Sequence, residues 1–537
     1  MSGTDEAVAT TKDRATLPPQ IGFIIGNEGC ERFSFYGMRN ILTQFLVVSP
    51  LLAVATQLER EAAAKEVFHT FVLGVYFFPL LGGWLADRFL GKYRVILYLS
   101  LVYCAGHACL ALFESNKAGF FTGLFLIALG SGGIKPCVAT FVGDQFDQTN
   151  KSRAKVVFDA FYWIINFGSF FASLLMPLFL KQLGPAVAFG VPGVLMFIAT
   201  LIFWLGRRQY VCVAPTPAHP DSFLRVVRTA LLAHGAGRAG LGLAGIGAAL
   251  ALAFLVLGFV DLGRMLLTHS EPLFGVAQSW CVALVAVIGF VGAGAWRQLD
   301  GARPFHPAEA VDGVRSVLRI LVLFLLVTPF WSLFDQKAST WVLQAGAMTK
   351  PAWFEPSQMQ ALNPLLVMIL IPFNNLALYP LLRRFGIEPT ALRRMAAGIA
   401  FSGLSWVAIG LMQFALDGGA PLSIVWQVWP YALLTFGEVL VSATGLEFAY
   451  SQAPAAMKGA IMAFWSLSVT VGNLWVLLVN AAVRNDGVTQ AIAGSGMGVM
   501  SFQMFFFAAF AFLAALAFGC YAARYPLADH YRQSGSA

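Results

Sequence analysis

The stretch Gly26–Asn40, GNEGCERFSFYGMRN, places four charged side chains between two apolar segments. Residues 21–25 read IGFII before it, and residues 41–48 read ILTQFLVV after it. One helix through this region would carry its charges into bilayer hydrocarbon, where each costs from ~3 to more than 10 kcal/mol. At 3.6 residues per turn, one stripe of that helix holds Glu28, Glu31, Arg32, Phe35 and Arg39. We therefore expect this stripe to face a polar cavity that the remaining helices enclose.

The composition is typical of a membrane protein with many spans. Of the 537 residues, 58% are hydrophobic and 12% are charged, whereas roughly a quarter of the residues in a soluble domain are charged. Much of the formal charge of +8 comes from Lys and Arg in short loops, and no basic stripe with stacking aromatic residues accompanies it. We therefore expect no binding of nucleic acid. The seven cysteines show no CxxC and no zinc-ligand spacing, so we expect no metal site.

Apolar segments recur along the chain in the order six, two, six. Their lengths suit membrane spans of ~20 residues. The first six lie near residues 21–49, 67–87, 94–113, 119–143, 156–180 and 187–206. Two follow a polar, proline-rich interval, near 239–262 and 274–296, and the last six lie near 315–346, 360–382, 392–415, 424–450, 457–483 and 499–522. We expect about 14 transmembrane helices.

This order predicts three parts: an N-terminal six-helix bundle over 1–207, a cytoplasmic linker with two additional transmembrane helices over 208–310, and a C-terminal six-helix bundle over 311–537. Two six-helix repeats around a central path are the architecture of major facilitator transporters. The loop GGWLADRFLGKYR, residues 82–94, resembles the signature of that superfamily, in which Asp87 and nearby bases would hold adjacent helix ends together. We therefore expect an all-α polytopic protein with a major facilitator fold.

The basic residues of the loops predict the orientation. The bases expected in the cytoplasm are Arg88, Lys92, Arg94, Lys151, Arg153, Lys155, Arg207, Arg208, Arg225, Arg228, Arg303, Arg315, Arg383, Arg384, Arg393 and Arg394. The opposite loops hold only scattered bases such as Lys117, Lys181 and Lys350. The first twenty residues are polar and lack an apolar signal region. We therefore expect a multi-pass inner-membrane protein with both termini in the cytoplasm.

Several motifs resemble those of the proton-dependent oligopeptide transporter (POT) family. EGCERF at Glu28–Phe33 resembles its ExxERF motif, and FYWIINFGS at Phe161–Ser169 resembles its FYxxINxGS motif. The further matches are Lys135-Pro136, Asp144-Gln145-Phe146, Phe334-Asp335-Gln336 and the run Thr444–Pro454. The resemblance implies a symporter that imports di- and tripeptides with protons, works as a monomer and needs no cofactor besides the coupling proton. The inserted pair of helices looks like that of bacterial members.

The resemblance also implies which residues carry protons. Glu28, Glu31 and Arg32 would form the coupling cluster. A carboxylate beside a guanidinium stays ionised, so separating the two would admit a proton. A static ion pair within the helix is the alternative. His69 matches a histidine familiar from animal members, and it is either a second proton site or a buried, hydrogen-bonded neutral histidine.

The substrate positions follow from the same resemblance. Tyr36, Arg39 and Lys135 would receive the peptide carboxylate, and Glu438 the α-ammonium. Asn166 and Asn363 would bind backbone amides. For the side-chain pockets we expect Tyr76, Trp331 and Trp465, although packing in the core explains these aromatic residues nearly as well.

A gate and several alternatives complete the predictions. Asp335 resembles the acid that pairs with Arg39 to close the outer gate, and Lys337 could compete for it. Two other cargoes or roles stay open, namely transport of nitrate or another small anion, and sensing of peptides without transport. No GxxxxGK[ST], HExxH or GxSxG motif occurs, which disfavours an ATP-driven pump and an intramembrane peptidase.

Overall fold

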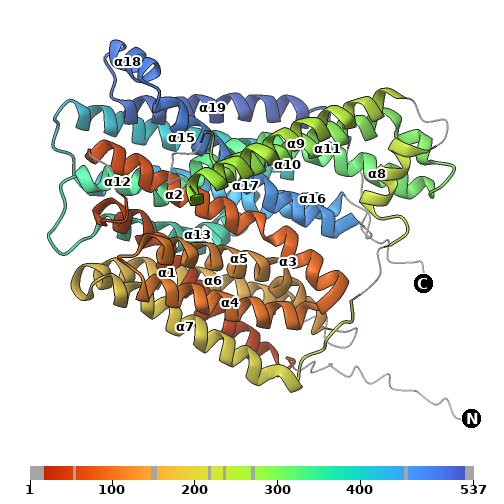
Figure 1. The fold of residues 1–537 in the computed structure, drawn as a ribbon, viewed down its shortest axis with the longest axis horizontal. Coiled ribbons are helices and arrows are strands. Elements are labelled where there is room, and N and C mark those ends of the chain that lie inside the picture. Colours follow the sequence, from red (N-terminus) through yellow and green to blue (C-terminus); the bar gives the residue numbers. More distant parts are fainter. Residues whose placement is uncertain are drawn as a thin grey trace, which may run out of the picture.

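Long helices run side by side through the molecule (Figure 1). The computed structural model describes residues 17–52, 56–146, 154–215, 219–233, 238–267, 273–452 and 457–526. Within these ranges the β-structure is one isolated bridge, between Thr349 and Ser423. The expected all-α fold is confirmed.

The N-terminal helices are α1 (Ile21–Val48), α2 (Gln57–Phe77), α3 (Pro79–Leu85), α4 (Lys92–Leu112), α5 (Lys117–Asp144), α6 (Ala154–Leu183) and α7 (Pro185–Leu205), with a π-helical turn at Ala86–Leu90. The middle of the chain forms a short helix and two long ones, α8 (Phe223–Leu232), α9 (Arg238–Leu267) and α10 (Val276–Gln298), with 3₁₀ turns at Gly206–Arg208 and Leu299–Ala302. In the picture, α8 lies at the right-hand end of the molecule (Figure 1).

The C-terminal helices are α11 (Ala308–Asp335), α12 (Thr340–Ala347), α13 (Leu362–Phe373), α14 (Tyr379–Arg384), α15 (Ala391–Asp417), α16 (Val428–Ser451), α17 (Lys458–Val483), α18 (Asp486–Gly494) and α19 (Val499–Ala522). Short turns of other helix types lie between them, at Gln336–Ala338, Pro356–Ala361, Asn374–Leu378 and Ile424–Gln427.

Thirteen helical stretches of the described chain are long and apolar enough to span a membrane. Because of its charges, α1 is not among them, although its length of 28 residues suffices. With α1 the spans follow the expected order of six, two and six. The division into parts at 207/208 and 310/311 remains a prediction.

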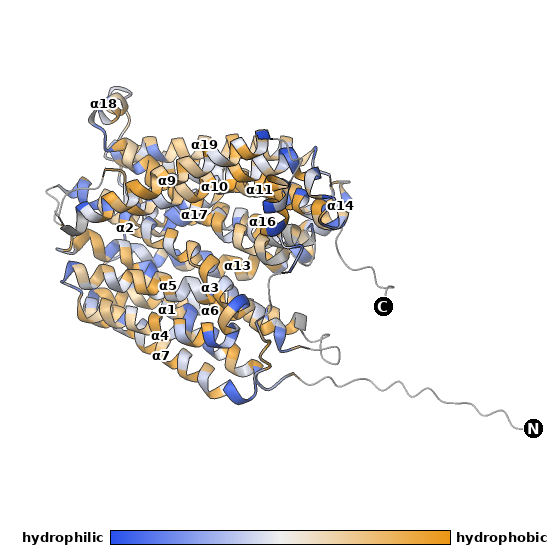
Figure 2. Cartoon of the chain, turned by 45° about the vertical axis from the view of Figure 1, so that its right-hand side comes forward, coloured by the Kyte–Doolittle hydropathy of each residue, from blue (hydrophilic) through white to orange (hydrophobic). Residues whose placement is uncertain are grey.

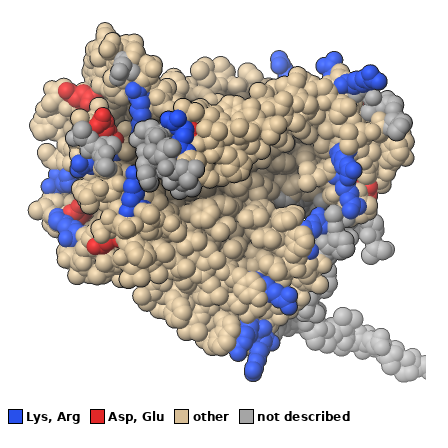
Figure 3. Space-filling model, viewed as in Figure 1, with Lys and Arg blue, Asp and Glu red and all other residues tan. Residues whose placement is uncertain are grey.

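The surface agrees with a membrane setting. The long helices are largely apolar along their length (Figure 2). In Figure 3, charged side chains gather at the two ends of the molecule and leave an uncharged band between them. Acidic and basic residues mix at one end, whereas the end that carries α8 shows mostly basic ones. The protein therefore spans a membrane along its long axis.

The second span is longer than its apolar stretch. A capping box begins α2 at Gln57, because Thr56 accepts from the Glu59 amide at 3.2 Å while Glu59 accepts from the Thr56 amide at 3.0 Å. Pro79 then interrupts the helix, and a π-turn follows.

A Cβ on Gly82 would lie 2.0 Å from the Gly133 carbonyl oxygen, so only glycine lets α3 and α5 cross this closely.

One of the bases expected to hold helix ends together also binds an acid of another helix. Lys92, at the start of α4, lies 2.7 Å from Asp144 at the end of α5. Asp87 lies within the π-turn Ala86–Leu90, and its role in holding helix ends together stays a prediction.

The helices pack as two groups. In the first, α1 contacts α6 and α7, and α4 contacts α5 and α7; in the second, α11 contacts α17 and α19, and α15 contacts α16 and α19. The inserted helices α9 and α10 pack on each other. Because α2 packs along α17, and α6 contacts α13, the two groups meet on either side of α1.

Candidate functional site

Two acids and one base lie together on α1. Arg32 Nε donates to Glu28 Oε1 at 2.6 Å and lies 2.9 Å from Glu31 Oε2. Both glutamates are 1% exposed, and neither oxygen of Glu31 accepts a well-aligned hydrogen bond within the described chain. One guanidinium cannot neutralise two buried carboxylates, so this cluster is one positive charge short. A proton or another cation can supply that charge.

Lys135 of α5 is the neighbouring cation, and it lies between two aromatic rings. Its Nζ is 4.3 Å from the centre of the Phe35 ring and 4.3 Å from that of Tyr76. Its charge also interacts with that of Glu31. Each cation–π contact stabilises by ~0.5–2 kcal/mol. The ring of Phe35 therefore holds the lysine ammonium from one side.

Arg39 and Asp335 form the expected pair between the two helix groups. Arg39 Nη2 donates to Asp335 Oδ1 at 2.6 Å, and the two residues are 4% and 2% exposed. Asn473 Nδ2 donates to the second carboxylate oxygen at 2.7 Å. Both oxygens of the acid are thus occupied, and α1, α11 and α17 meet there.

His69 extends this network to α2. Its Nδ1 lies 2.7 Å from Asn473 Oδ1, and its Nε2 lies 2.9 Å from Ser339 Oγ. The Asn473 oxygen can only accept, so Nδ1 carries the hydrogen; Nε2 pairs with the Ser339 hydroxyl, which also lies 3.4 Å from the Gln336 carbonyl. The ring is fully buried. Full burial disfavours the charged form of the ring, and the proton role stays a prediction.

More polar contacts join the two groups near the C-terminal end of α1. Thr43 Oγ1 donates to the Ala338 carbonyl at 2.9 Å, and Gln44 Nε2 donates to Glu355 Oε2 at 2.9 Å. Lys181 of α6 lies 2.6 Å from the same acid. With the Arg39 pair, these bonds fasten the molecule at the end predicted to face outward.

Glu438 of α16 lies in a second network. Asn363 Nδ2 donates to Glu438 Oε2 at 2.5 Å, and Lys337 Nζ donates to Asn363 Oδ1 at 2.7 Å. The same ammonium lies 3.4 Å from the centre of the Phe334 ring. Among the described residues Lys337 forms no ion pair with Asp335, so the expected competition with Arg39 is absent from this arrangement.

Tyr36 lies between the two charged regions. Its hydroxyl is in the field of Arg32 and Arg39 from its own helix and of Glu438 from α16.

Trp331 and Trp465 pack edge to face with ring centres 5.8 Å apart, and both are nearly buried. Asn166, in contrast, donates to the Tyr162 carbonyl of its own helix at 3.0 Å.

Most of the predicted residues thus come together around α1. Glu28, Glu31 and Arg32 lie together, Tyr76 adjoins Lys135, Asn363 adjoins Glu438, and Arg39 adjoins Asp335. Of the run Thr444–Pro454, Ala453 and Pro454 lie outside the described residues. The described part holds no group of three or more acid, His or Cys side chains placed to bind a metal.

Sequence reasoning missed two partners. Asn473 links the gate acid to His69, and Lys337 reaches Glu438 through Asn363. A lone amide within the apolar helix LSVTVGNLWVLL was the available signal for Asn473, because a buried amide needs several hydrogen-bond partners.

Comparison with known proteins decides the family. The model of the POT family matches residues 93–492. The chain belongs to the POT family. Among curated proteins, rabbit (Oryctolagus cuniculus) solute carrier family 15 member 2 is 33% identical over 424 residues, which are 76% of this chain and 50% of the relative. Peptide transporter 3 of Caenorhabditis elegans is 33% identical over 422 residues, 75% of this chain and 52% of the relative. The chain spans about half the length of these relatives.

Solved POT family structures agree over nearly the whole chain. The crystal structure of an auto-inhibited POT family peptide transporter is 65% identical, has a TM-score of 0.92, and is matched over 96% of this chain and 99% of that one. The POT family transporter PepTSo is 64% identical with a TM-score of 0.91, over 96% and 100%. The major facilitator architecture expected from the sequence is thereby confirmed.

Proposed function

We propose that this POT family member imports di- and tripeptides together with protons across the cell inner membrane. Buried charges of opposite sign carry the proposal, because the two helix groups contribute them from opposite sides. The first group supplies Lys135 and Arg39, and the second supplies Glu438. A zwitterionic peptide has a carboxylate at one end and an ammonium at the other, and this polarity suits it. The curated relatives named as peptide transporters support the same substrate class.

Proton coupling would reside in the α1 cluster. The cluster holds two carboxylates and one guanidinium, so it is stabilised when a proton or the Lys135 ammonium supplies a second positive charge. A peptide carboxylate that binds Lys135 would move this ammonium away from the cluster. Protonation of a glutamate would then become more favourable. Binding of peptide and proton uptake would then reinforce each other. No cofactor beyond the proton is required.

In alternating access, the contacts that join the two helix groups at the predicted outer side would break and form again. The Arg39–Asp335 pair and the bonds around Glu355 hold the halves together at the predicted outer side, so this arrangement is closed to the outside. Opening requires these bonds to break, while the buried charges rehydrate. We assign both termini to the cytoplasm from the basic residues, and we expect a monomer to carry out the cycle.

Uptake of labelled dialanine into proteoliposomes under an inward proton gradient tests the proposal. We expect gradient-driven accumulation in the parent, its loss with preserved exchange in Glu28→Gln, and loss of peptide binding in Glu438→Gln. Unchanged accumulation in Glu28→Gln would contradict coupling through α1. Binding without accumulation in the parent would indicate a receptor, and nitrate uptake without peptide uptake would indicate an anion carrier.

A further inference from the structure

The short helix α8 is amphipathic and lies outside the predicted transport path. Its buried residues recur at the helical spacing i, i+3, i+4, i+7, namely Phe223, Val226, Val227 and Ala230. This apolar face packs on α10, on α11 and on the turn after α10. The opposite face leaves Leu224 75% exposed and Leu232 59% exposed. Exposed leucines beside membrane-spanning helices suit contact with lipid better than contact with water.

The C-terminal end of α8 is fixed at the level where the inserted spans begin and end. Gln298, the last residue of α10, donates to the carbonyls of Ala230 at 2.8 Å and Leu231 at 3.0 Å. Its side-chain oxygen accepts from the amide of Gly240, in the first turn of α9, at 3.1 Å. One buried amide thus holds α8 against both inserted helices. Since these helices span the membrane, α8 lies at the membrane surface.

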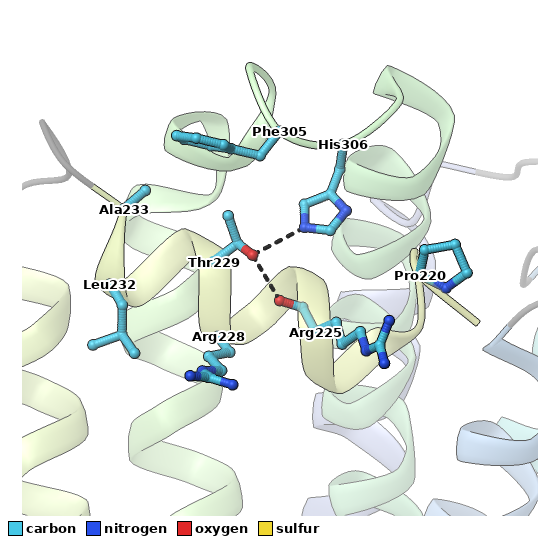
Figure 4. Close-up of a pocket in the computed structure, with 8 residues that line it drawn as sticks. All are labelled: Pro220, Arg225, Arg228, Thr229, Leu232, Ala233, Phe305 and His306. Carbon is cyan, nitrogen blue, oxygen red and sulfur yellow. Dashed lines mark hydrogen bonds between the residues drawn. The ribbon is translucent and has the colours of Figure 1, made fainter. Parts of the chain in front are cut away.

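A pocket opens beside this helix, and His306 and Thr229 of its wall are hydrogen-bonded to each other (Figure 4). His306 lies 2.9 Å from Thr229 Oγ1 and 2.7 Å from Asp221 Oδ1, one contact at each ring nitrogen. The Thr229 hydroxyl also lies 3.0 Å from the Arg225 carbonyl, which can accept from it. The Asp221 carboxylate can only accept, so Nδ1 of the ring donates to it.

Among the residues that line the pocket, the two permanently charged ones are Arg225 and Arg228. Neither side chain forms an ion pair within the part of the chain that the structure describes. Their neighbours Arg303 and Arg315 differ, because both bind Asp300 and Asp312 at 2.7–3.3 Å. In Figure 4, Arg225, Arg228 and Leu232 extend from one edge of α8. Two unneutralised guanidinium groups thus stand beside apolar surface.

We propose that this pocket binds the headgroup of an anionic phospholipid. The phosphodiester would lie between Arg225 and Arg228, because guanidinium groups bind phosphate oxygens through pairs of hydrogen bonds. Leu232 and Phe305, which is 60% exposed in the pocket wall, would contact the glycerol and the first acyl carbons. A free phosphate ion would leave these apolar side chains uncovered. Basic residues at a membrane surface also gain from the negative potential of anionic lipids.

Lipid binding to the purified protein tests this proposal independently of transport. Native mass spectrometry would count bound phosphatidylglycerol and phosphatidylcholine as each is titrated into the detergent-solubilised full chain. We expect the parent to prefer phosphatidylglycerol, and the double variant Arg225→Gln/Arg228→Gln to lose this preference about tenfold. The variant Arg383→Gln/Arg384→Gln removes two charges from the end of α14, and we expect it to match the parent.

Three results would overturn the proposal. The first is an unchanged preference in the α8 double variant, and the second is an equal loss in the control variant. The third is displacement of phosphatidylglycerol by millimolar inorganic phosphate, which would make free phosphate the ligand. A melting temperature in phosphatidylcholine equal to that of the parent would verify that the α8 variant is folded.

Discussion

Replacing Asp335 by Asn should open the fastened end of the molecule. The substitution keeps an oxygen that can accept from Asn473 and removes only the charge that Arg39 binds at 2.6 Å. Arg39 is 4% exposed, and leaving a buried charge unpaired costs about 3–5 kcal/mol. Separation of the halves would hydrate the guanidinium and relieve this cost. Even 2 kcal/mol changes the ratio of closed to open molecules about 30-fold.

Single-molecule energy transfer measures this ratio. Dyes on Val48→Cys and Trp353→Cys, at two exposed positions near the fastened end, would report the separation once the exposed Cys212 and Cys520 are replaced by Ser. The control Thr43→Val removes one neutral hydrogen bond at the same interface, worth about 1 kcal/mol, so its shift should be far smaller. Equal distance distributions for Asp335→Asn, the control and the parent would refute the reasoning.

Three further substitutions test the site and the packing. Phe35→Tyr should keep peptide uptake within about twofold, whereas Phe35→Leu should lower it severalfold because one ring beside the lysine ammonium is lost; equal rates would contradict the cation–π role. His69→Gln preserves one donor and one acceptor, so the pH profile of uptake should not move, and a shifted profile would make this histidine a proton carrier. Gly82→Ala should lower the melting temperature by several degrees, while Gly22→Ala, with open space around its Cβ position, should not.

The fold was predictable because hydropathy and loop charge are properties of sequence segments. The helix ends were less so: Gln57–Lys65 is polar enough to look like a loop, yet a capping box makes it the first turns of α2. A hydropathy pattern also does not predict where a span is interrupted, as the second span is at Pro79.

The site was predictable where one helix supplies it. Glu28 and Arg32 are four residues apart, and helical geometry alone brings them together. Pairing across the two helix groups depends on packing, which explains why the partner of Lys337 was missed. Nothing in the sequence indicates that Asn363 accepts from this lysine while donating to Glu438. The π-contact between Lys135 and Phe35 likewise became visible only when α5 lay against α1.

The charges of α1 have a consequence for biosynthesis. The partner of Arg39 is Asp335, which the ribosome adds 296 residues later. At about 5–20 residues per second, that interval lasts roughly 15–60 s. During that time the arginine has no counter-ion from α11. Because of its charges, α1 is the span least suited to move from the insertion machinery into lipid without other helices. Newly made α1 must therefore wait at the translocon or in a hydrated niche until the second half arrives, and chains truncated before residue 335 should be prime substrates for membrane proteases.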